Sequence, residues 1–327
     1  MSKCKFWALK SGFNGQAKLS DFKLVEEKLP TSLKDGELVC QAIYLSVDPY
    51  MRLFTHLSKA GEPVAGEQIA KVINSKNAKY PVGTIIRLSC GWRSHTHVKD
   101  ASTIDLMPEL GDLPLSLTLG IMGMPGMTAY FTLLDVLKIQ KGETLVVSGA
   151  AGAVGSLVGQ IGKILGCTVI GFAGTDAKIK WLKELGFDHA FNYRTEDIGK
   201  SIEKVAPDGV HCYCDMVGGE ISFKVMQHLR EYGRMVVLGT ISTYNKSGDV
   251  TGPYLFEDIL KKSLTITGFI IFNIREKWHI GEKQMAEWIR QGKLKYKETI
   301  TEGFEHMPEA FLGLFEGKNT GKAVVKA

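Results

Sequence analysis

From residue 144 onward, the chain alternates between short apolar runs and longer amphipathic ones. The apolar runs have the length of buried β-strands and lie at 144–148, 168–172, 190–192, 210–217 and 235–239. Runs with helical spacing separate them, at 154–165, 176–185, 196–206 and 221–230. Because strand–helix–strand alternation folds into a parallel sheet covered by helices, this part of the chain is predicted to be a doubly wound α/β domain.

The first 112 residues have a different character. Their turn signals include Asp35-Gly36 and Pro81-Val82-Gly83. Strand-like runs lie between the turns, at 38–45, 69–73 and 84–89. The pattern predicts a compact, barrel-like β domain that precedes the α/β domain.

Beyond residue 240 the pattern is less regular. An apolar run at 264–272 predicts a further strand, and residues 282–291 predict a helix. Residues 297–327 revert to turns and short strands such as 323–325. We expect this last segment to fold back onto the first domain.

Composition excludes several classes of protein. The 327 residues are 44% hydrophobic and 23% charged, which is ordinary for a globular protein of two domains. The net charge of +5 is mild and scattered, so neither nucleic acid nor a membrane surface is an expected partner. Six cysteines without a framework spacing, and no signal-like segment, point to the reducing cytoplasm. Residues 113–134 carry no charge, but their prolines and glycines favour a buried, irregular pocket wall over a membrane span.

The segment Ser148-Gly149-Ala150-Ala151-Gly152-Ala153-Val154-Gly155 lies between a predicted strand and a predicted helix. It has the form A-x-G-x-x-G of a dinucleotide-binding loop. Gly152 would let the backbone approach a pyrophosphate, and Gly155 would allow close packing of helix on strand. The helix N-terminus would supply free N–H groups to the phosphates. A glycine-rich turn without a ligand is the alternative.

The second predicted strand of this region favours NADP over NAD. An NAD enzyme usually has an acidic residue there to bind the ribose 2′-hydroxyl, but Ala173-Gly174 end the strand without one. Lys178 follows in the next predicted helix, and Tyr193-Arg194 end the next predicted strand. Cations at these places suit a 2′-phosphate. Taken alone, Lys178 is better interpreted as a solvated helix cation.

No metal site is expected. The order of domains also fits the zinc alcohol dehydrogenases, which hold zinc through cysteine and histidine. Here the only close cysteines are Cys212 and Cys214, which would share one face of a buried strand, and His95 and His97 have no cysteine nearby. Neither a GxSxG nor an HExxH motif occurs.

Without a metal, a reductase must hold developing negative charge through hydrogen bonds. Tyr244 follows the predicted strand at 235–239, and ligands bind at the carboxyl ends of such strands. A phenol with a pKa near ~10 is a neutral donor at pH 7. Tyr244 is therefore the candidate catalytic residue; a loop tyrosine with a structural hydrogen bond is the alternative.

Several motifs together resemble a known family. They are Val47-Asp48-Pro49-Tyr50-Met51-Arg52, Gly123-Met124-Pro125-Gly126-Met127-Thr128-Ala129-Tyr130, residues 150–155, Phe191-Asn192-Tyr193, Ile241-Ser242-Thr243-Tyr244-Asn245 and Gly321-Lys322. Over nearly its whole length the chain resembles the zinc-independent branch of the medium-chain dehydrogenase/reductase superfamily. The resemblance implies a GroES-like β-barrel catalytic domain of residues 1–120 and 296–327, with an inserted Rossmann domain of residues 121–295.

The resemblance also implies the site residues. Those implied to contact NADP(H) are Gly152, Ala153, Val154, Gly155, Lys178, Tyr193, Met216, Leu238, Gly239, Thr240, Ile241, Ser242, Thr243, Tyr244, Phe269, Ile270, Ile271 and Asn319. Met216 departs from the family, which usually has Asn there, so a polar contact is missing or is made by the backbone. A substrate slot is implied near Tyr50 and Met124, and a homodimer joined along the edge of the Rossmann sheet.

The implied reaction is NADPH-dependent reduction of the C=C bond of α,β-unsaturated ketones and aldehydes. Hydride would reach the β-carbon, and Tyr244 with a ribose hydroxyl would hold the enolate. Implied substrates are 15-oxo-prostaglandins, 2-alkenals and, by alcohol oxidation, leukotriene B4. A quinone oxidoreductase and a non-enzymatic NADPH-binding structural protein remain as alternatives.

The substrate side of this prediction has its own alternatives. Trp92 and Met124, with Phe54 and Met122, could line a slot for a lipid chain, whereas core packing is the ordinary role of such residues. Arg52 could pair with a lipid carboxylate or be a solvated surface cation.

Overall fold

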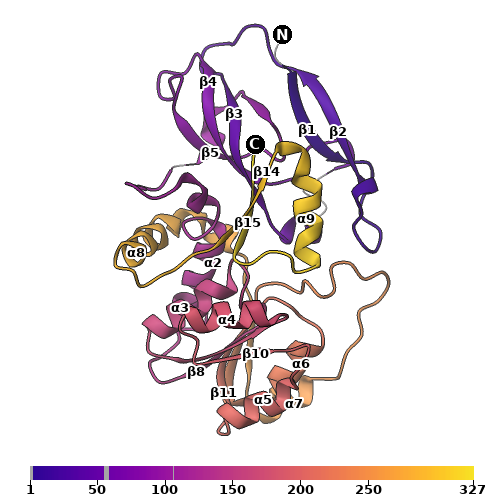
Figure 1. Cartoon of the computed structure of the whole chain (residues 1–327), viewed down its shortest axis with the longest axis vertical. Coiled ribbons are helices and arrows are strands. Elements are labelled where there is room, and N and C mark those ends of the chain that lie inside the picture. The colour runs from indigo at the N-terminus through magenta and orange to yellow at the C-terminus, as the bar shows by residue number, and fades with distance from the viewer. Residues whose placement is uncertain (1–2, 55–58, 106) are drawn as a thin grey trace. The chain divides into compact units, whose positions relative to one another are not determined.

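The computed structural model describes residues 3–54, 59–105 and 107–327 (Figure 1). The chain divides into two compact units, Met1–Leu119 with Glu298–Ala327 and Gly120–Lys297, here named unit 1 and unit 2. Unit 1 is rich in sheet and unit 2 is a parallel sheet with helices, which confirms the predicted α/β class. Within the described ranges, no helix combines the length and the apolar character needed to cross a membrane.

Unit 1 contains two sheets. Strands β1 and β2 form an antiparallel pair, and β14-β15-β3-β4-β5-β7 form a larger sheet in that order, with β6 paired to β3. The C-terminal strand β15 lies between β14 and β3, so the end of the chain does return to the first sheet, as expected. The strands are β1 (Lys3–Leu9), β2 (Phe22–Lys28), β3 (Leu38–Val47), β4 (Glu67–Ser75), β5 (Ile85–Ser89), β6 (His95–Val98), β7 (Ile104–Asp105), β14 (Glu298–Glu302) and β15 (Lys322–Lys326).

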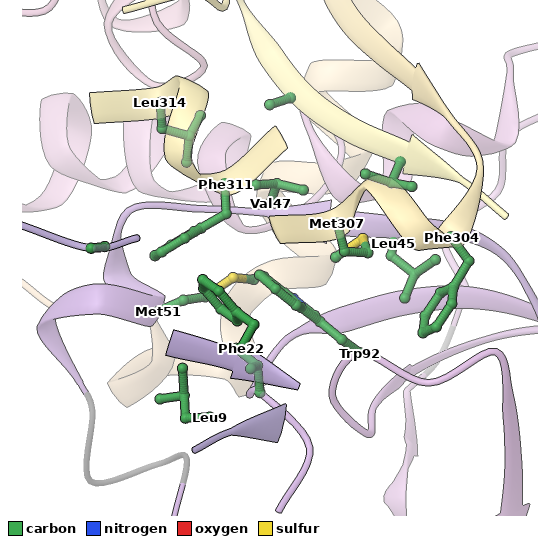
Figure 2. Packing of buried hydrophobic residues seen from close by; sticks show 14 of the residues in the cluster. Leu9, Phe22, Leu45, Val47, Met51, Trp92, Phe304, Met307, Phe311 and Leu314 are labelled. Atoms are coloured by element: carbon green, nitrogen blue, oxygen red, sulfur yellow. The ribbon is translucent and has the colours of Figure 1, made fainter. Parts of the chain in front are cut away.

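One hydrophobic cluster in the core of unit 1 is built around aromatic rings (Figure 2). Phe311 comes from α9 (Met307–Phe315), and its ring centroid lies 5.7 Å from that of Trp92 and 6.0 Å from that of Phe22. Helix α9 was not predicted within the segment at 297–327. Its signal is present in the sequence: a proline in the first turn, then buried Met307, Phe311 and Leu314 at helical spacing.

Unit 2 contains six parallel strands in the order β10-β9-β8-β11-β12-β13. In chain order this is 3-2-1-4-5-6, the Rossmann arrangement, and the order reverses between β8 and β11. Ligands bind at such a switch point, outside the carboxyl ends of the strands. The strands are β8 (Thr144–Val147), β9 (Thr168–Ala173), β10 (His189–Asn192), β11 (Val210–Asp215), β12 (Leu229–Val237) and β13 (Thr265–Gly268).

The helices of unit 2 follow the predicted alternation. Helix α2 packs on α3 and α8, and buried Pro125 and Met127 show that part of the uncharged stretch lies inside the unit. The helices are α2 (Met124–Phe131), α3 (Gly155–Ile164), α4 (Asp176–Glu184), α5 (Ile198–Val205), α6 (Glu220–Gln227), α7 (Phe256–Lys261) and α8 (Trp278–Arg290).

Three predicted boundaries in unit 2 are wrong, and one of them is the start of α8, which lies at Trp278 and not at residue 282. Strand β12 begins at Leu229, where a helix was predicted, because an irregularity with Tyr232 at φ +60 lets residues 229–234 pair with only 210–212 of β11. Strand β13 ends at Gly268, short of the predicted residue 272. Its partner β12 ends at Val237, which pairs with Gly268, and a 3₁₀ helix begins at Ile271.

Candidate active site

The loop after β8 is shaped by its glycines. Gly149 has a φ of +59, a conformation that side-chain-bearing residues rarely adopt. A Cβ on Gly155 would lie 2.5 Å from the carbonyl oxygen of Gly149, so α3 can begin this close to β8 only with glycine there. This is the close packing that the sequence predicted for Gly155.

Gly152 is less tightly enclosed than Gly155, although an added Cβ there would still make one tight contact. A Cβ on Gly152 would meet only the carbonyl oxygen of Gly149, at 3.3 Å. The glycine thus keeps open a space next to the N-terminus of α3, where the first N–H groups of a helix lack partners within the helix. The loop fits the pyrophosphate of a dinucleotide in both shape and charge.

The loops after β9 and β10 bring two cations together. Lys178 lies in the first turn of α4, whose N-cap Thr175 accepts a hydrogen bond from the Lys178 backbone N–H at 3.3 Å. Burial, and secondarily the charge of Arg194, lower the pKa of Lys178. A Cβ on Gly174 would lie 2.7 Å from the Tyr193 hydroxyl and 3.2 Å from Nε of Arg194.

This arrangement suits a 2′-phosphate, since an anion would relieve the repulsion between Lys178 and Arg194. Asp176, the nearest carboxylate in the sequence, is engaged elsewhere: its Oδ1 accepts a hydrogen bond from Asn192 at 2.8 Å. Arg194, which the sequence grouped with Lys178 as a cation suited to a 2′-phosphate, directly follows Tyr193 after the end of β10.

The loop after β11 is fixed through its backbone. The Met216 N–H donates to the Ser148 hydroxyl at 3.0 Å, and the Met216 carbonyl accepts from the Ile241 N–H at 3.4 Å. The thioether of Met216 is half-exposed and has no N–H to donate. Met216 therefore offers a cofactor only an apolar side chain.

Tyr244 lies in the loop after β12, where the sequence predicted it. Its hydroxyl oxygen accepts a hydrogen bond from the Thr240 backbone N–H at 3.1 Å, which leaves the hydroxyl proton available for donation. Burial raises the pKa of Tyr244 further above its usual value near ~10. The phenol is consequently a neutral donor throughout the physiological pH range. The loop is held to its neighbour by a hydrogen bond from the Ser242 N–H to the Val217 carbonyl at 3.0 Å.

The remaining predicted cofactor residues lie in two places. Phe269 follows β13, and its N–H donates to the Val237 carbonyl at 3.2 Å; Ile271 begins the 3₁₀ helix after it. Asn319 belongs to unit 1, where its side-chain amide donates to the Gly321 carbonyl at 2.9 Å. Phe269 and Ile271 thus lie at the same carboxyl edge of the unit 2 sheet as the glycine-rich loop.

The predicted substrate residues differ in exposure. Tyr50 and Arg52 are half-buried on α1 (Tyr50–Leu53); the Arg52 guanidinium lies 4.9 Å from the Phe13 ring centroid and donates to the Gly15 carbonyl at 2.9 Å. Met124 is half-buried at the start of α2 in unit 2.

Trp92 does not fit the predicted substrate slot. It is 0% exposed and its ring stacks on Phe22 with centroids 5.8 Å apart, so its surface is used in core packing (Figure 2). Met122 is likewise fully buried. Of the two interpretations of Trp92 and Met122, the structure supports core packing and not the lining of a substrate slot.

The candidate metal ligands are either paired with another side chain or buried. Nε2 of His97 lies 2.9 Å from Oε2 of Glu37, and burial lowers the pKa of His95. Cys212 and Cys214 are buried in β11, and burial raises the pKa of each thiol. Across residues 3–54, 59–105 and 107–327, no group of three His, Cys, Asp or Glu side chains is arranged to hold a metal ion. Metal independence stays a prediction.

The chain matches the sequence models of two protein families. One, described as the N-terminal domain of oxidoreductase, matches residues 5–106, and the other, described as zinc-binding dehydrogenase, matches residues 153–288. The second description names the family as a whole and says nothing about the ligands in this chain.

Individual proteins match over the full length. The chain is 46% identical over 334 residues to prostaglandin reductase 1 of Sus scrofa, covering 100% of both. It is 36% identical to the NADP(+)-dependent 2-alkenal reductase of Nicotiana tabacum, covering 97% of this chain and 95% of that one. It also resembles the crystal structure of CurA in complex with NADPH from Vibrio vulnificus, with a TM-score of 0.91, 36% identity and 99% of each chain covered.

Proposed function

This chain belongs to the zinc-independent branch of the medium-chain dehydrogenase/reductase superfamily, with prostaglandin reductase 1 among its relatives, and from that premise we propose how it works. It is an NADPH-dependent reductase of the C=C bond in α,β-unsaturated ketones and aldehydes. The predicted family, cofactor and class of reaction are confirmed by the full-length similarity to two reductases and to an NADPH complex.

The hydrogen bonding and the protonation of the Tyr244 hydroxyl support its role as the catalytic residue. Its oxygen already accepts a hydrogen bond from the Thr240 N–H, and burial keeps its hydroxyl protonated. A positioned neutral donor at the carboxyl edge of the sheet is what a developing oxyanion requires in the absence of a metal. We assign Tyr244 as the catalytic residue.

In the proposed mechanism, NADPH when bound supplies the hydride that reduces the β-carbon of the substrate. Negative charge then develops on the substrate's carbonyl oxygen, and the Tyr244 hydroxyl donates a hydrogen bond to that oxygen. The interaction strengthens as the charge grows, which lowers the barrier. The α-carbon takes a proton from Tyr244 or from water, which completes the saturated product.

The cofactor residues have separate proposed roles. Gly152 to Gly155 and the N-terminus of α3 bind the pyrophosphate, and Gly155 also fixes the helix against the strand. Lys178, Tyr193 and Arg194 bind the 2′-phosphate, because the charge of Arg194 acts on Lys178 and a bound anion would relieve the repulsion between these two cations. The loop from Leu238 to Tyr244 and residues 269–271 bind the nicotinamide half. For Asn319 the proposal rests on the family resemblance.

The substrates proposed within this class are lipid enones and enals. The names of the relatives support 15-oxo-prostaglandins and 2-alkenals, and leukotriene B4 would be handled by alcohol oxidation. Tyr50, Arg52 and Met124 remain the proposed substrate contacts. Trp92 is withdrawn from this set because it is fully buried.

Unit 1 is proposed to be the substrate domain and unit 2 the NADP-binding domain. We also propose a homodimer joined along β13, which stands at the edge of the described six-stranded sheet. Large apolar side chains are exposed on α7, which precedes β13 in the chain, with Phe256 at 68% and Leu260 at 79%, and exposed apolar side chains of this size are common at interfaces. Six free cysteines, of which five are buried, support the expected cytoplasmic location.

The test of the function is NADPH oxidation measured across matched enones, enals and quinones at one pH. The proposal expects turnover of 2-alkenals and 15-oxo-prostaglandins, with quinones turned over more slowly. Turnover of quinones alone would identify a quinone oxidoreductase. NADPH binding without any turnover across the panel would identify a binding protein that is not an enzyme.

A further inference from the structure

Asp215, the last residue of β11, has an unusual set of hydrogen-bond partners. It is 1% exposed and lies at the switch point between β8 and β11. Its carboxylate accepts from three hydroxyl groups and two backbone N–H groups. The donors are the hydroxyls of Ser148, Tyr213 and Ser222 and the N–H groups of Val217 and Gly218.

The first branch of this network leads to the glycine-rich loop. Ser148 directly follows β8, and its hydroxyl donates to Oδ1 of Asp215 at 2.8 Å. The same hydroxyl oxygen accepts from the Met216 N–H at 3.0 Å. The start of the phosphate-binding loop is thus tied to the loop after β11 through one side chain.

The second branch leads to Tyr244. The carboxylate holds the N–H groups of Val217 and Gly218 at 3.0 and 3.1 Å, which fixes the turn after β11. That turn packs directly on the next loop: a Cβ on Gly218 would lie 2.8 Å from Cβ of Thr240. The Thr240 N–H in turn donates to the Tyr244 hydroxyl.

We propose that Asp215 is a positioning residue that sets the geometry of the NADPH-binding loop and of the Tyr244 loop together. Burial of a carboxylate costs free energy unless its oxygens are hydrogen-bonded, and here five donors provide those hydrogen bonds. The same bonds fix the two loops that flank the switch point. The proposal rests on the assignment of NADPH and Tyr244 made above.

Two hydroxyl deletions form a matched pair for testing the first branch. Ser148→Ala and Tyr213→Phe each remove one hydroxyl that donates to the same Oδ1 at 2.8 Å, but that of Ser148 also accepts a backbone N–H from the loop after β11. We expect Ser148→Ala to weaken NADPH binding at least ~3-fold, by fluorescence titration, since a buried partner is lost. Tyr213→Phe should stay within about twofold of wild type. Equal effects of the two variants, or no effect of Ser148→Ala, would overturn the proposal.

Substitutions of Asp215 itself separate geometry from mere stability. Asp215→Asn retains an oxygen that can accept from the four groups that donate to Oδ1. The Asn NH₂ group replaces Oδ2 and can donate to the Ser222 hydroxyl oxygen, provided that the Ser222 hydroxyl proton rotates away. NADPH binding should therefore stay within about threefold of wild type, whereas Asp215→Ala should weaken it at least ~10-fold. An Asn variant as impaired as the Ala variant, with both folded, contradicts the proposal. If Asp215→Ala does not fold, the Ser148→Ala and Asp215→Asn variants still test whether Asp215 positions the NADPH-binding loop.

A double-mutant cycle tests the second branch. If Asp215 acts on the chemistry through Tyr244, the loss of kcat for Asp215→Asn or Asp215→Ala should be smaller in a Tyr244→Phe background than in wild type. Additive losses overturn this branch. The NADPH titrations need no enone turnover, so a failure of the proposed reaction and a failure of the positioning role give different results.

Discussion

The carboxyl edge of the unit 2 sheet and the core of unit 1 are built by opposite means. At the edge, glycines, backbone N–H groups and short polar side chains form the loops, and Gly152 has only one neighbouring atom within 4 Å of the position of an added Cβ. In the core of unit 1, Trp92, Phe22 and Phe311 fill the space with aromatic rings. The comparison teaches that, in this protein, small residues mark where a ligand binds and large apolar ones mark where the chain packs on itself. Substitutions should therefore affect activity in the first region and stability in the second.

The largest expected effect is on stability, from Trp92→Ala. Removal of a fully buried tryptophan should lower the free energy of unfolding by about 3–5 kcal/mol. Chemical denaturation followed by circular dichroism measures it. The folded fraction should bind NADPH within about twofold of wild type. Unchanged stability with a strongly raised KM for enones would return Trp92 to the substrate slot and break the comparison.

Next in size is Tyr244→Phe, which keeps the ring and deletes only the hydroxyl. Losing one oxyanion donor lowers kcat by about 10²–10³-fold, or ~2.7–4 kcal/mol. The fall should appear in kcat and kcat/KM alike, because the interaction is made in the transition state. NADPH affinity should change little. A kcat within about twofold of wild type, with hydride transfer rate-limiting, would show that Tyr244 is a structural tyrosine.

A smaller effect is expected from Lys178→Ala. The unmutated protein should bind NADPH at least ~10-fold tighter than NADH, about 1.4 kcal/mol, and the substitution should narrow this gap by weakening NADPH alone. Isothermal titration with both cofactors measures the gap. Lys180→Ala, on the exposed face of the same helix, is the matched control and should leave the gap unchanged. Equal affinity of the wild type for both cofactors would refute the 2′-phosphate assignment.

The smallest expected effect is that of metal removal. Turnover should survive exhaustive chelation, since the described residues bring no three metal-binding side chains together. Elemental analysis should find zinc well below one ion per chain. A tightly bound zinc whose removal abolishes turnover would instead support an alcohol-dehydrogenase mechanism.

The sequence could predict the parts of the site that depend on local spacing. Gly152 and Gly155 lie at fixed offsets between a strand and a helix, and Tyr244 follows a parallel strand, so chain order alone brings them to one edge. Trp92 could not be placed in this way. Whether an aromatic residue packs in a core or lines a slot depends on its neighbours from distant segments, here Phe22 and Phe311.

The network around Asp215 was also out of reach from sequence. A single aspartate at the end of a strand is common, and its five donors come from the residue after β8, from β11, from α6 and from the loop between β11 and α6. Only the three-dimensional pairing of β8 with β11 brings Ser148 next to it. Likewise, the start of β12 was missed because the irregularity at Tyr232 interrupts the apolar pattern.

The proposed reaction saturates an activated C=C bond and leaves the carbonyl group intact. Mass spectrometry and NMR of the product formed from a 2-alkenal and one equivalent of NADPH test it most directly. The account predicts the saturated aldehyde, with the carbonyl carbon retained and two hydrogens added across the α and β carbons. An allylic alcohol as the product, with the double bond retained, would contradict it.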